Sequence, residues 1–310
     1  MRIFSIVVIF NGMNRDWIKK CFTSLQNSTY NTVIIAIDNG SSDESVNFIK
    51  RQFPSVILIE SNENLGFGRA NNLGINYAVN KNANYVFLLN QDAWIQSDTI
   101  EKLVVELEKN PKYGIISPLH LTGNGKFLDL SFSKSISPQY CKNLYSDFVL
   151  NQNFNKVYES HFICAAAWLI SKNCLQKIGG FNPTFFHYGE DDNFVHRLHF
   201  KSLKLGVLPT CRIYHDREER STNVAFENNY YLERNKYLLN VSNPDLKLSV
   251  DDVLRHLRIV LIKTYFNFNL KQRTDTKKLL RFFKENKKEI DNNLDISKKD
   301  FFPFLEINNV

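Results

Sequence analysis

The chain has 310 residues, of which 43% are hydrophobic and 23% are charged. This length and composition suit one large domain, or one domain with an extension, and exclude a disordered or fibrous chain. The five cysteines include no CxxC pair and are odd in number, which argues against a disulfide framework and a zinc ribbon. Such cysteine usage favours a reducing compartment, so we expect a cytoplasmic protein.

The net charge is +7, and nearly all of the excess lies in one C-terminal stretch. Residues 251–290 contain eleven Lys or Arg and five Asp or Glu. No motif that reads a nucleic acid accompanies these charges, so we expect no nucleic-acid partner. The stretch is either a solvated helical face or a surface that contacts anionic lipid headgroups. The second alternative predicts a peripheral location on the inner face of the cell membrane.

The first 117 residues alternate short apolar runs with apolar residues at helical spacing. The expected helices follow the strands, one of them over Asp43–Gln52. Alternation of this kind predicts an α/β fold, with a mostly parallel central sheet that helices cover on both faces. Such sheets bind ligands at the carboxyl ends of their strands, where the strand order reverses. The predicted strands are Ile3–Ile9, Val33–Ile37, Val56–Ile59, Tyr85–Leu89 and Tyr113–Ser117.

The pattern changes after Pro118. Residues 118–160 lack clear periodicity, and we expect a hairpin and a long loop there. The apolar run Phe162–Ile170 is too short to span a membrane, which takes about 20 residues, and predicts a buried strand. Beyond it we expect helices from Ser171 to Gly179, over Glu190–Ser202, Val224–Asn240, Val253–Asn269 and Thr276–Glu289, and strands at Leu205–Leu208 and Arg212–His215.

Five residues that could carry chemistry lie at the ends of four predicted elements. Asp38 and Asp92 each close a predicted strand, Glu190 and Asp191 open a helix, and His215 ends a later strand. Each residue also has a structural interpretation: a turn, a favourable charge at a helix N-terminus, or a buried histidine. Because the strand ends of the predicted sheet share one edge, we expect all of them to gather around one cleft.

Six segments in a fixed order resemble the family-2 inverting glycosyltransferases of the GT-A fold, particularly the bacterial rhamnosyltransferase-like members. The similarity covers roughly residues 1–240. It implies a catalytic domain over residues 1–221, with a nucleotide-sugar half (1–117) and an acceptor half (118–221), and a helical extension over residues 222–310. The segments are Ser5–Asn11, Asp38–Asp43, Asn64–Asn72, Leu88–Asp92, Gly179–Phe181 and Tyr188–Asp191.

The resemblance implies roles for individual residues around a donor. Asp38 would accept the N3–H of a pyrimidine base. Asp92 would hold Mg2+ or Mn2+ on the diphosphate, in a degenerate metal motif of which only this residue keeps its carboxylate, and His215 would complete the metal or phosphate site. The other substrate-binding residues that the resemblance suggests are Asn11, Asn39, Asn64, Gly66, Arg69, Asn71, Asn90, Gln91 and Arg234.

The same resemblance makes Asp191, next to Glu190, the catalytic base. Asp192 is an extra acid beside it, so the choice between Asp191 and Asp192 stays open. Arg234 would reach a phosphate or form a structural salt bridge. The implied reaction is one displacement with inversion, in which the base takes the proton of the attacking hydroxyl as the new bond forms. A UDP- or dTDP-sugar would be the donor, with dTDP-rhamnose suggested by the resemblance, and a saccharide or lipid-linked saccharide of a surface polysaccharide or lipopolysaccharide the acceptor.

Three other functions were weighed against this one. A nicotinamide-linked enzyme would need its glycine fingerprint after the first strand, whereas Gly66-Phe67-Gly68 follows the third, with Asn71 where a third glycine belongs. A nucleotidyltransferase would carry a glycine-rich basic loop after the first strand, which Phe10–Asn14 is not. A non-catalytic nucleotide-sugar-binding module would not need all three of Asp38, Asp92 and Asp191, so the presence of these residues argues against it.

Overall fold

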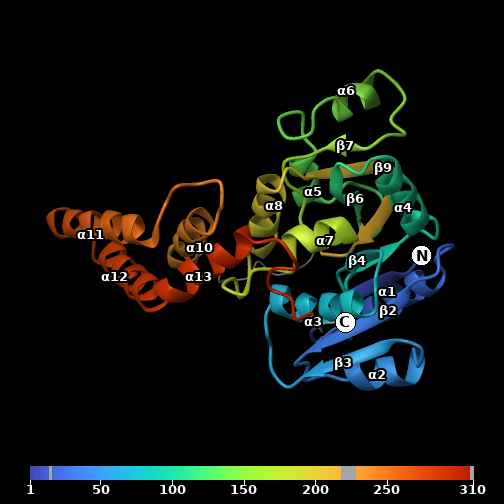
Figure 1. The fold of residues 1–310 in the computed structure, drawn as a ribbon, viewed down its shortest axis with the longest axis horizontal. Coiled ribbons are helices and arrows are strands. Elements are labelled where there is room, and N and C mark those ends of the chain that lie inside the picture. The colour runs from blue at the N-terminus through green and yellow to red at the C-terminus, as the bar shows by residue number, and fades with distance from the viewer. Residues whose placement is uncertain (14–15, 218–227, 308–310) are drawn as a thin grey trace.

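A computed structural model of the chain describes residues 1–13, 16–217 and 228–307. These residues form an α/β body and an arm of helices that extends to one side of it (Figure 1). One nine-stranded sheet runs through the described part of the body, in the order β3-β2-β1-β4-β8-β6-β9-β5, with β7 paired to β9. The architecture confirms the predicted α/β class.

The first four strands of the sheet are parallel. In register, Ile9 lies beside Asp38, and Asn39 lies beside Ser61, so the strands end at one common edge. Neighbouring residues of β1 enter different hydrophobic clusters: Ile6 faces α3 and Val7 faces α1. Burial on both faces explains the unbroken apolar runs. The elements are β1 (Ile3–Ile9), α1 (Trp17–Gln26), β2 (Val33–Asn39), α2 (Ser45–Gln52), β3 (Ile57–Ser61), α3 (Phe67–Asn80) and β4 (Tyr85–Leu89).

The other half of the sheet mixes directions. Strand β8 lies antiparallel between β4 and β6, whereas β6 and β9 are parallel to each other. Two of its strands, β5 and β7, were not predicted, because three and two residues are too few to show a period. The elements are β5 (Ala93–Ile95), α4 (Thr99–Lys109), β6 (Tyr113–Thr122), α5 (Leu130–Ser135), α6 (Leu144–Val149), β7 (Tyr158–Glu159), β8 (Ala167–Ser171), α7 (Lys172–Ile178), α8 (Glu190–Phe200) and β9 (Lys204–His215).

Two predicted strand ends were wrong, and proline explains both. Strand β6 continues through Pro118 to Thr122, and β9 is one strand instead of two. The register between them jumps after the Pro118–Leu208 pair, so that Leu119 lies beside Arg212. A bulge at this point accommodates prolines, which have no N–H for the ladder. The predicted strand Phe162–Ile170 also begins later, at Ala167.

The described part of the arm has four helices, one more than predicted. They are α10 (Asn229–Val241), α11 (Val250–Phe266), α12 (Leu270–Glu285) and α13 (Lys287–Lys298); the predicted start at Val224 lies outside the described residues. A third hydrophobic cluster holds the arm together and includes Phe185 of the body. Among the described residues, no helix has the length and apolar character needed to cross a membrane.

The chain returns to the body after α13. The backbone N–H of Gly180 donates to the carbonyl oxygen of Pro303 at 2.9 Å. A Cβ on Gly179, whose φ is +69°, would lie 1.7 Å from that same oxygen, so only glycine fits this contact. Phe302 and Leu305 then join the main core. The final described residues thereby attach the C-terminal end of α13 to the body, against α3 and α7 (Figure 1).

Candidate functional site

A cavity of about 530 Å3 opens at the carboxyl ends of β1, β2 and β4. This is the edge at which the parallel half of the sheet meets antiparallel β8, the place where α/β sheets bind ligands. Phe186 and His187 close it from the loop that leads to α8. Seven of the predicted site residues line it together: Asn11, Asn39, Asn64, Gly66, Asn90, Gln91 and Asp92.

Amide side chains build the wall of this cavity. Asn39 donates from Nδ2 to Oδ1 of Asn64 at 3.1 Å and accepts the N–H of Leu65 at 2.7 Å. Gln91 bonds the backbone of Phe10 twice, accepting its N–H at 2.9 Å and donating to its carbonyl oxygen at 3.0 Å. These residues therefore fix the loops after β1, β2 and β4 relative to one another.

Glycines bring the start of α3 against the loop before α8. Gly66 has a φ of +81°, and a Cβ there would lie 2.0 Å from the carbonyl oxygen of Phe186. A Cβ on Gly68 would lie 2.9 Å from Cβ of Phe181 and 3.5 Å from Cβ of Glu190. The sequence Gly66-Phe67-Gly68 thus serves close packing between the nucleotide-side helix and the acidic segment, and not a dinucleotide fingerprint.

Four predicted substrate-binding residues lie outside the set of described residues that line the cavity. Asp38 is buried at the end of β2, and its carboxylate accepts the N–H of Ser41 at 3.2 and 3.4 Å. Arg69 donates to the carbonyl oxygen of Pro183 at 3.0 and 2.7 Å. Both side chains shape loops around the cavity.

The remaining two also make local contacts. Asn71 donates to the carbonyl oxygen of Phe67, one turn earlier in α3, at 2.9 Å. Arg234 belongs to the arm, where its guanidinium lies 5.0 Å from the ring centre of Tyr231 and 5.4 Å from that of Phe282. Its guanidinium also donates to Oδ1 of Asn235 at 3.1 and 3.4 Å, and the phosphate contact and the salt bridge both stay predictions.

A buried row of charged side chains joins the end of β4 to the end of β9. His215 Nε2 lies 3.5 Å from Oδ1 of Asp92, and its Nδ1 lies 3.4 Å from Oδ2 of Asp129. Arg217 donates to the two oxygens of Asp129 at 2.8 and 3.3 Å. Asp92, His215 and Asp129 are 3% exposed or less, so water screens these interactions little. Asp92 and His215 therefore do converge, as predicted.

Asp129 is a site residue that the sequence analysis missed. It precedes α5, where its Oδ1 also accepts the N–H of Phe132 at 2.9 Å. An aspartate before a short helix gives only the signal of a helix cap, and the aperiodic stretch around it offered no strand end to place it. Its partner Arg217 likewise lies just beyond the last predicted strand.

The surroundings of His215 determine its charge. Burial by itself lowers the pKa of His215, but the charge of Asp92 and the hydrogen bond with Asp129 outweigh burial, and the net shift is upward. Burial raises the pKa of Asp129, yet His215, Arg217 and the backbone N–H of Phe132 together bring it far below its usual value. Asp129 is thus held as a carboxylate, and His215 binds a proton more readily than a free imidazole does.

The predicted base sits at the start of α8. Gly189, with φ +95°, turns the chain into this helix. Oδ2 of Asp191 accepts the N–H of Ala165 at 3.4 Å, and the neighbouring Ala166 accepts the N–H of Asn90 at 2.9 Å through its carbonyl oxygen. The turn before β8 therefore contacts both Asp191 and the end of β4. This connection links Asp191 to the end of β4, although the described lining of the cavity includes neither Asp191 nor His215.

Three adjacent carboxyl groups repel one another at this helix start. Burial, followed by the charges of Asp191 and Asp192, raises the pKa of Glu190 to about 8. Burial and the charge of Asp191 raise the pKa of Asp192 to about 7, and burial raises that of Asp191. A raised pKa makes a carboxylate a stronger base. The segment has the electrostatic character of an acid–base site.

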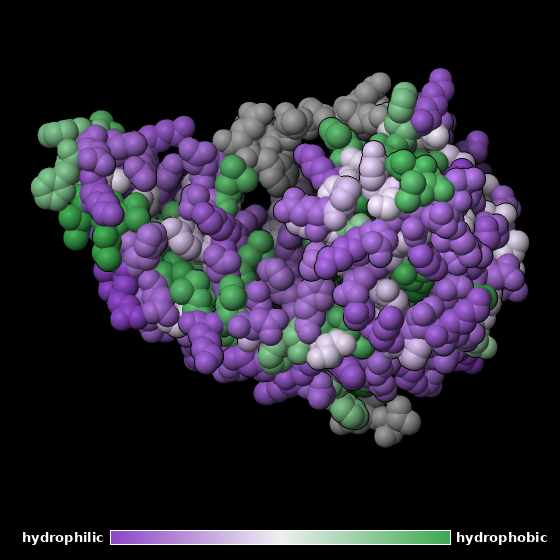
Figure 2. All heavy atoms as spheres, turned by 90° about the horizontal axis from the view of Figure 1, so that it is seen from above, coloured by the Kyte–Doolittle hydropathy of each residue, from purple (hydrophilic) through white to green (hydrophobic). Residues whose placement is uncertain are grey.

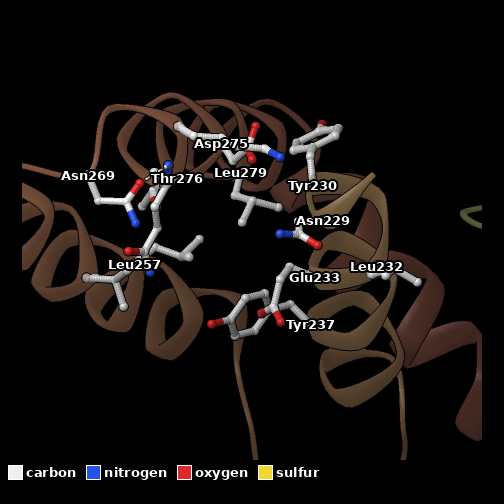
Figure 3. Close-up of a pocket in the computed structure, with 13 residues that line it drawn as sticks. Asn229, Tyr230, Leu232, Glu233, Tyr237, Leu257, Asn269, Asp275, Thr276 and Leu279 are labelled. Carbon is white, nitrogen blue, oxygen red and sulfur yellow. Dashed lines mark hydrogen bonds between the residues drawn. The ribbon is translucent and has the colours of Figure 1, made fainter. Parts of the chain in front are cut away.

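A second cavity, of about 570 Å3, lies within the arm. Asn229 and Glu233 of α10 face Asp275 and Leu279 of α12 across it (Figure 3). Its described lining includes none of the predicted site residues. The chemistry is therefore assigned to the cavity at the sheet edge.

Comparison with known proteins agrees with this geometry. The profile of "Glycosyl transferase family 2" matches residues 5–179, more than half of the chain. The chain belongs to this family. A second profile, "N-terminal domain of galactosyltransferase", matches residues 148–219. The predicted family is thereby confirmed, and the chain is a glycosyltransferase.

Curated relatives extend the similarity. The chain is 26% identical over 258 residues to the low-salt glycan biosynthesis hexosyltransferase Agl10 of Haloferax volcanii, covering 80% of this chain and 78% of that one. It is 27% identical over 174 residues to glycosyltransferase GlyA of Streptococcus pneumoniae, covering 54% of this chain and 24% of that one. This glycosyltransferase thus spans most of the first relative and about a quarter of the second.

Solved structures share its fold. S. aureus TarS 1–349 in complex with UDP superposes with a TM-score of 0.55 at 14% identity, over 96% of this chain and 90% of that one. GalNAc-T7 with UDP, GalNAc and Mn2+ gives a TM-score of 0.56 at 14% identity, over 78% and 51%. This likeness confirms the predicted GT-A fold of the glycosyltransferase.

Proposed function

We propose that this glycosyltransferase moves a sugar from a UDP- or dTDP-sugar to an acceptor hydroxyl of a surface polysaccharide or lipopolysaccharide, with inversion at the anomeric carbon. The observation that carries the proposal is the joint position of the amide-walled cavity, Asp92 and Asp191 at one sheet edge. The relatives with bound UDP support a nucleotide donor. The family resemblance supports rhamnose as a sugar to test first.

In this proposal the donor nucleotide occupies the cavity. Asp38 lies at the carboxyl end of β2, beside the strand that contributes Asn11 to the lining. Its carboxylate has lone pairs beyond those that accept the N–H of Ser41, so it can also accept the N3–H of a pyrimidine. The loops fixed by Asn39, Asn64 and Gln91 hold the remaining nucleoside contacts in place.

The residues around His215 fit a divalent cation. When His215 is neutral and its Nδ1–H is directed to Asp129, the lone pair of Nε2 would face a carboxylate oxygen of Asp92 across 3.5 Å. Two electron-pair donors at this distance are suited to share a cation, and a carboxylate behind a histidine is a common arrangement around metals. No group of three or more His, Cys, Asp or Glu in the described part of the chain could hold a metal alone.

Asp92 and His215 would therefore hold Mg2+ or Mn2+ together with water and the oxygens of the diphosphate, as hard cations prefer. When bound, the cation supplies positive charge beside the leaving diphosphate. Asp129 and Arg217 keep His215 in the orientation in which Nε2 lies beside Asp92, which lines the cavity.

Asp191 acts as the base in the proposed reaction. The acceptor hydroxyl attacks the anomeric carbon from the face opposite the diphosphate, and one displacement gives inversion. An alcohol is far less acidic than a carboxylic acid, so its proton passes to Asp191 late in the attack. Burial raises the pKa of Asp191 and thereby increases its basicity.

One assay tests the proposal directly. The purified protein is incubated with a panel of UDP- and dTDP-sugars and Mn2+, with and without a chelator, and donor binding is followed by thermal shift. We expect one pyrimidine nucleotide sugar to raise the melting temperature and to be consumed, with NMR showing an inverted anomeric configuration in the product. A retained configuration, or stabilisation by purine nucleotides alone, would overturn the assignment.

A further inference from the structure

The end of the arm that lies farthest from the catalytic body carries an unusual number of exposed apolar side chains. We define the hairpin tip as residues 259–270, the end of α11 and the turn into α12. Green, apolar spheres gather at this end of the molecule in Figure 2, and Figure 1 shows it to be the outer end of α11 and α12. The exposed large apolar side chains of the hairpin tip, with their exposed fractions, are Ile259 54%, Ile262 58%, Tyr265 49%, Phe266 78%, Phe268 85% and Leu270 69%.

Helix α11 has two apolar faces. Val253, Leu257 and Thr264 are buried, and the first two enter the hydrophobic cluster of the arm. Ile259, Ile262 and Phe266 recur at the helical spacing i, i+3, i+7 on the opposite side, where they are exposed. A helix that only had to complete the core of the arm would need the first face alone. The second face is left for something outside the arm.

The charge around the hairpin tip restricts which partner the exposed apolar face of α11 can bind. From Arg255 to Lys278 the sequence contains seven Lys or Arg and a single acid, Asp275. At 3.6 residues per turn, Arg258 and Lys263 flank the exposed apolar stripe of α11 on its two sides. Arg255 lies in line with the stripe, one turn before Ile259, and is paired with Asp252. A surface with apolar side chains bordered by basic ones is complementary to anionic headgroups above a hydrocarbon layer.

We propose that the hairpin tip docks on an anionic lipid surface. Phe266 and Phe268 enter the boundary between headgroups and acyl chains, and the basic residues contact the headgroup phosphates. Two copies of a tip with this charge repel each other, which disfavours a second copy of the chain as the occupant. The tip is the convex end of a helical hairpin, a shape suited to insertion into a layer.

If the hairpin tip docks on a membrane, the arm connects the membrane surface to the catalytic body, which lies at the opposite end of the arm. The inference stands apart from the proposed transfer reaction, because lipid binding by the tip needs neither donor nor base. The two can therefore fail separately. Two further aromatic residues of α12 do not belong to the docking surface, because Phe283 is fully buried and Phe282 packs against the hydrophobic cluster of the arm.

Vesicle flotation tests the proposal with the full chain. One set of vesicles is phosphatidylcholine alone and the other contains phosphatidylglycerol as well. We expect binding to the anionic vesicles only, and weaker binding as salt is added. The double variant F266S/F268S should bind at least about tenfold more weakly, since each phenylalanine loses apolar burial. The variant R258Q/K263Q should lose about fivefold for each charge removed.

Matched controls come from the catalytic body. Phe127→Ser replaces a phenylalanine that is 67% exposed, and Lys126→Gln removes an exposed lysine beside it; both should bind vesicles like the parent protein. Unchanged melting temperatures would show that the tip variants are folded. Equal binding to both vesicle types, or unchanged binding by F266S/F268S, would overturn the proposal. So would self-association that disappears in F266S/F268S while vesicles bind nothing.

Discussion

Gly66 and Phe186 touch so closely that a single methyl group on Gly66 would meet the carbonyl oxygen of Phe186 at 2.0 Å. The contact joins the first residue before α3 to the loop that carries the acidic segment of α8. The position of the cavity wall is therefore coupled, through this packing contact and the loop before α8, to the position of the proposed base.

Gly66→Ala should disrupt this link. The positive φ of Gly66 and the clash with backbone both disfavour alanine, and we expect a loss of about 2 kcal/mol or more in the free energy of unfolding. Donor binding and turnover should both fall, because the loop has to move. Isothermal titration with UDP and denaturant unfolding measure the two effects.

Gly114→Ala is the matched control. A Cβ on Gly114 meets side-chain atoms of Leu198 and Cys174, not backbone, and its φ is not positive. This variant should lose some stability but bind UDP normally. Normal UDP binding and turnover in Gly66→Ala would contradict the link.

Asp191→Asn should reduce turnover by at least about 100-fold, the lower end for loss of a general base. Donor affinity should persist, because Asp191 is not among the described residues that line the proposed donor cavity. The change keeps the size of the side chain, so the bond from Ala165 to Oδ2 can be retained if the amide oxygen takes its place. Steady-state kinetics and donor titration separate the two quantities.

Asp192→Asn is the neighbouring control for the base. If Asp191 is the base, this variant keeps most of its turnover. The opposite result, loss in Asp192→Asn with a nearly normal Asp191→Asn, would transfer the role to Asp192.

Asp129→Asn should weaken Mn2+ binding about 10- to 100-fold, the usual range for a group that orients a metal-binding histidine. Asparagine still caps α5, so the change acts mainly on the contacts with His215 and Arg217. Calorimetric titration of Mn2+ in the presence of UDP measures the affinity without any turnover. Asp98→Asn, at a surface aspartate paired with Lys102, serves as control. Equal affinity in the two variants would remove Asp129 from the site.

Glu190 should make the stability of the protein depend on pH. Its pKa rises from 4.5 to about 8 on folding, so between these values the folded state binds the proton more strongly than the unfolded state. The free energy of unfolding therefore falls as pH rises through this window and levels off above about pH 8. Glu190→Gln removes that contribution. Its stability relative to the parent should increase from pH 5 to pH 8, as urea unfolding at several pH values would show; a constant difference would speak against it.

Much of the parallel half of the fold could be predicted because strands buried on both faces, such as Ile3–Ile9, are unbroken apolar runs. The rest depended on interactions that no local pattern reports. Pro118 looked like a strand end, but a bulge opposite β9 absorbs it. The ends of β4 and β9 pointed to Asp92 and His215, whereas Asp129 reaches them from a loop and shows only as a cap.

The predicted binding residues have two different physical roles: some line the cavity, and others stabilise the loops and helices around it. Asn11 and Asn64 line the cavity, while Arg69 and Asn71 use their polar groups on nearby carbonyl oxygens. Sequence similarity marks all of them alike, because residues that shape a loop and residues that face its ligand occupy the same short segment.

After the arm, the chain returns to the body and packs on Gly179 and Gly180, so the arm is attached to the body at both of its ends. Helices α10–α13 lie between β9 and a final segment that both belong to the core of the body. The arm is thus an insertion with two attachment points, not a tail. Cutting the chain after β9 would also strip Phe302 and Leu305 from the core. An arm-free enzyme would have to be built by splicing the last segment back through a short linker.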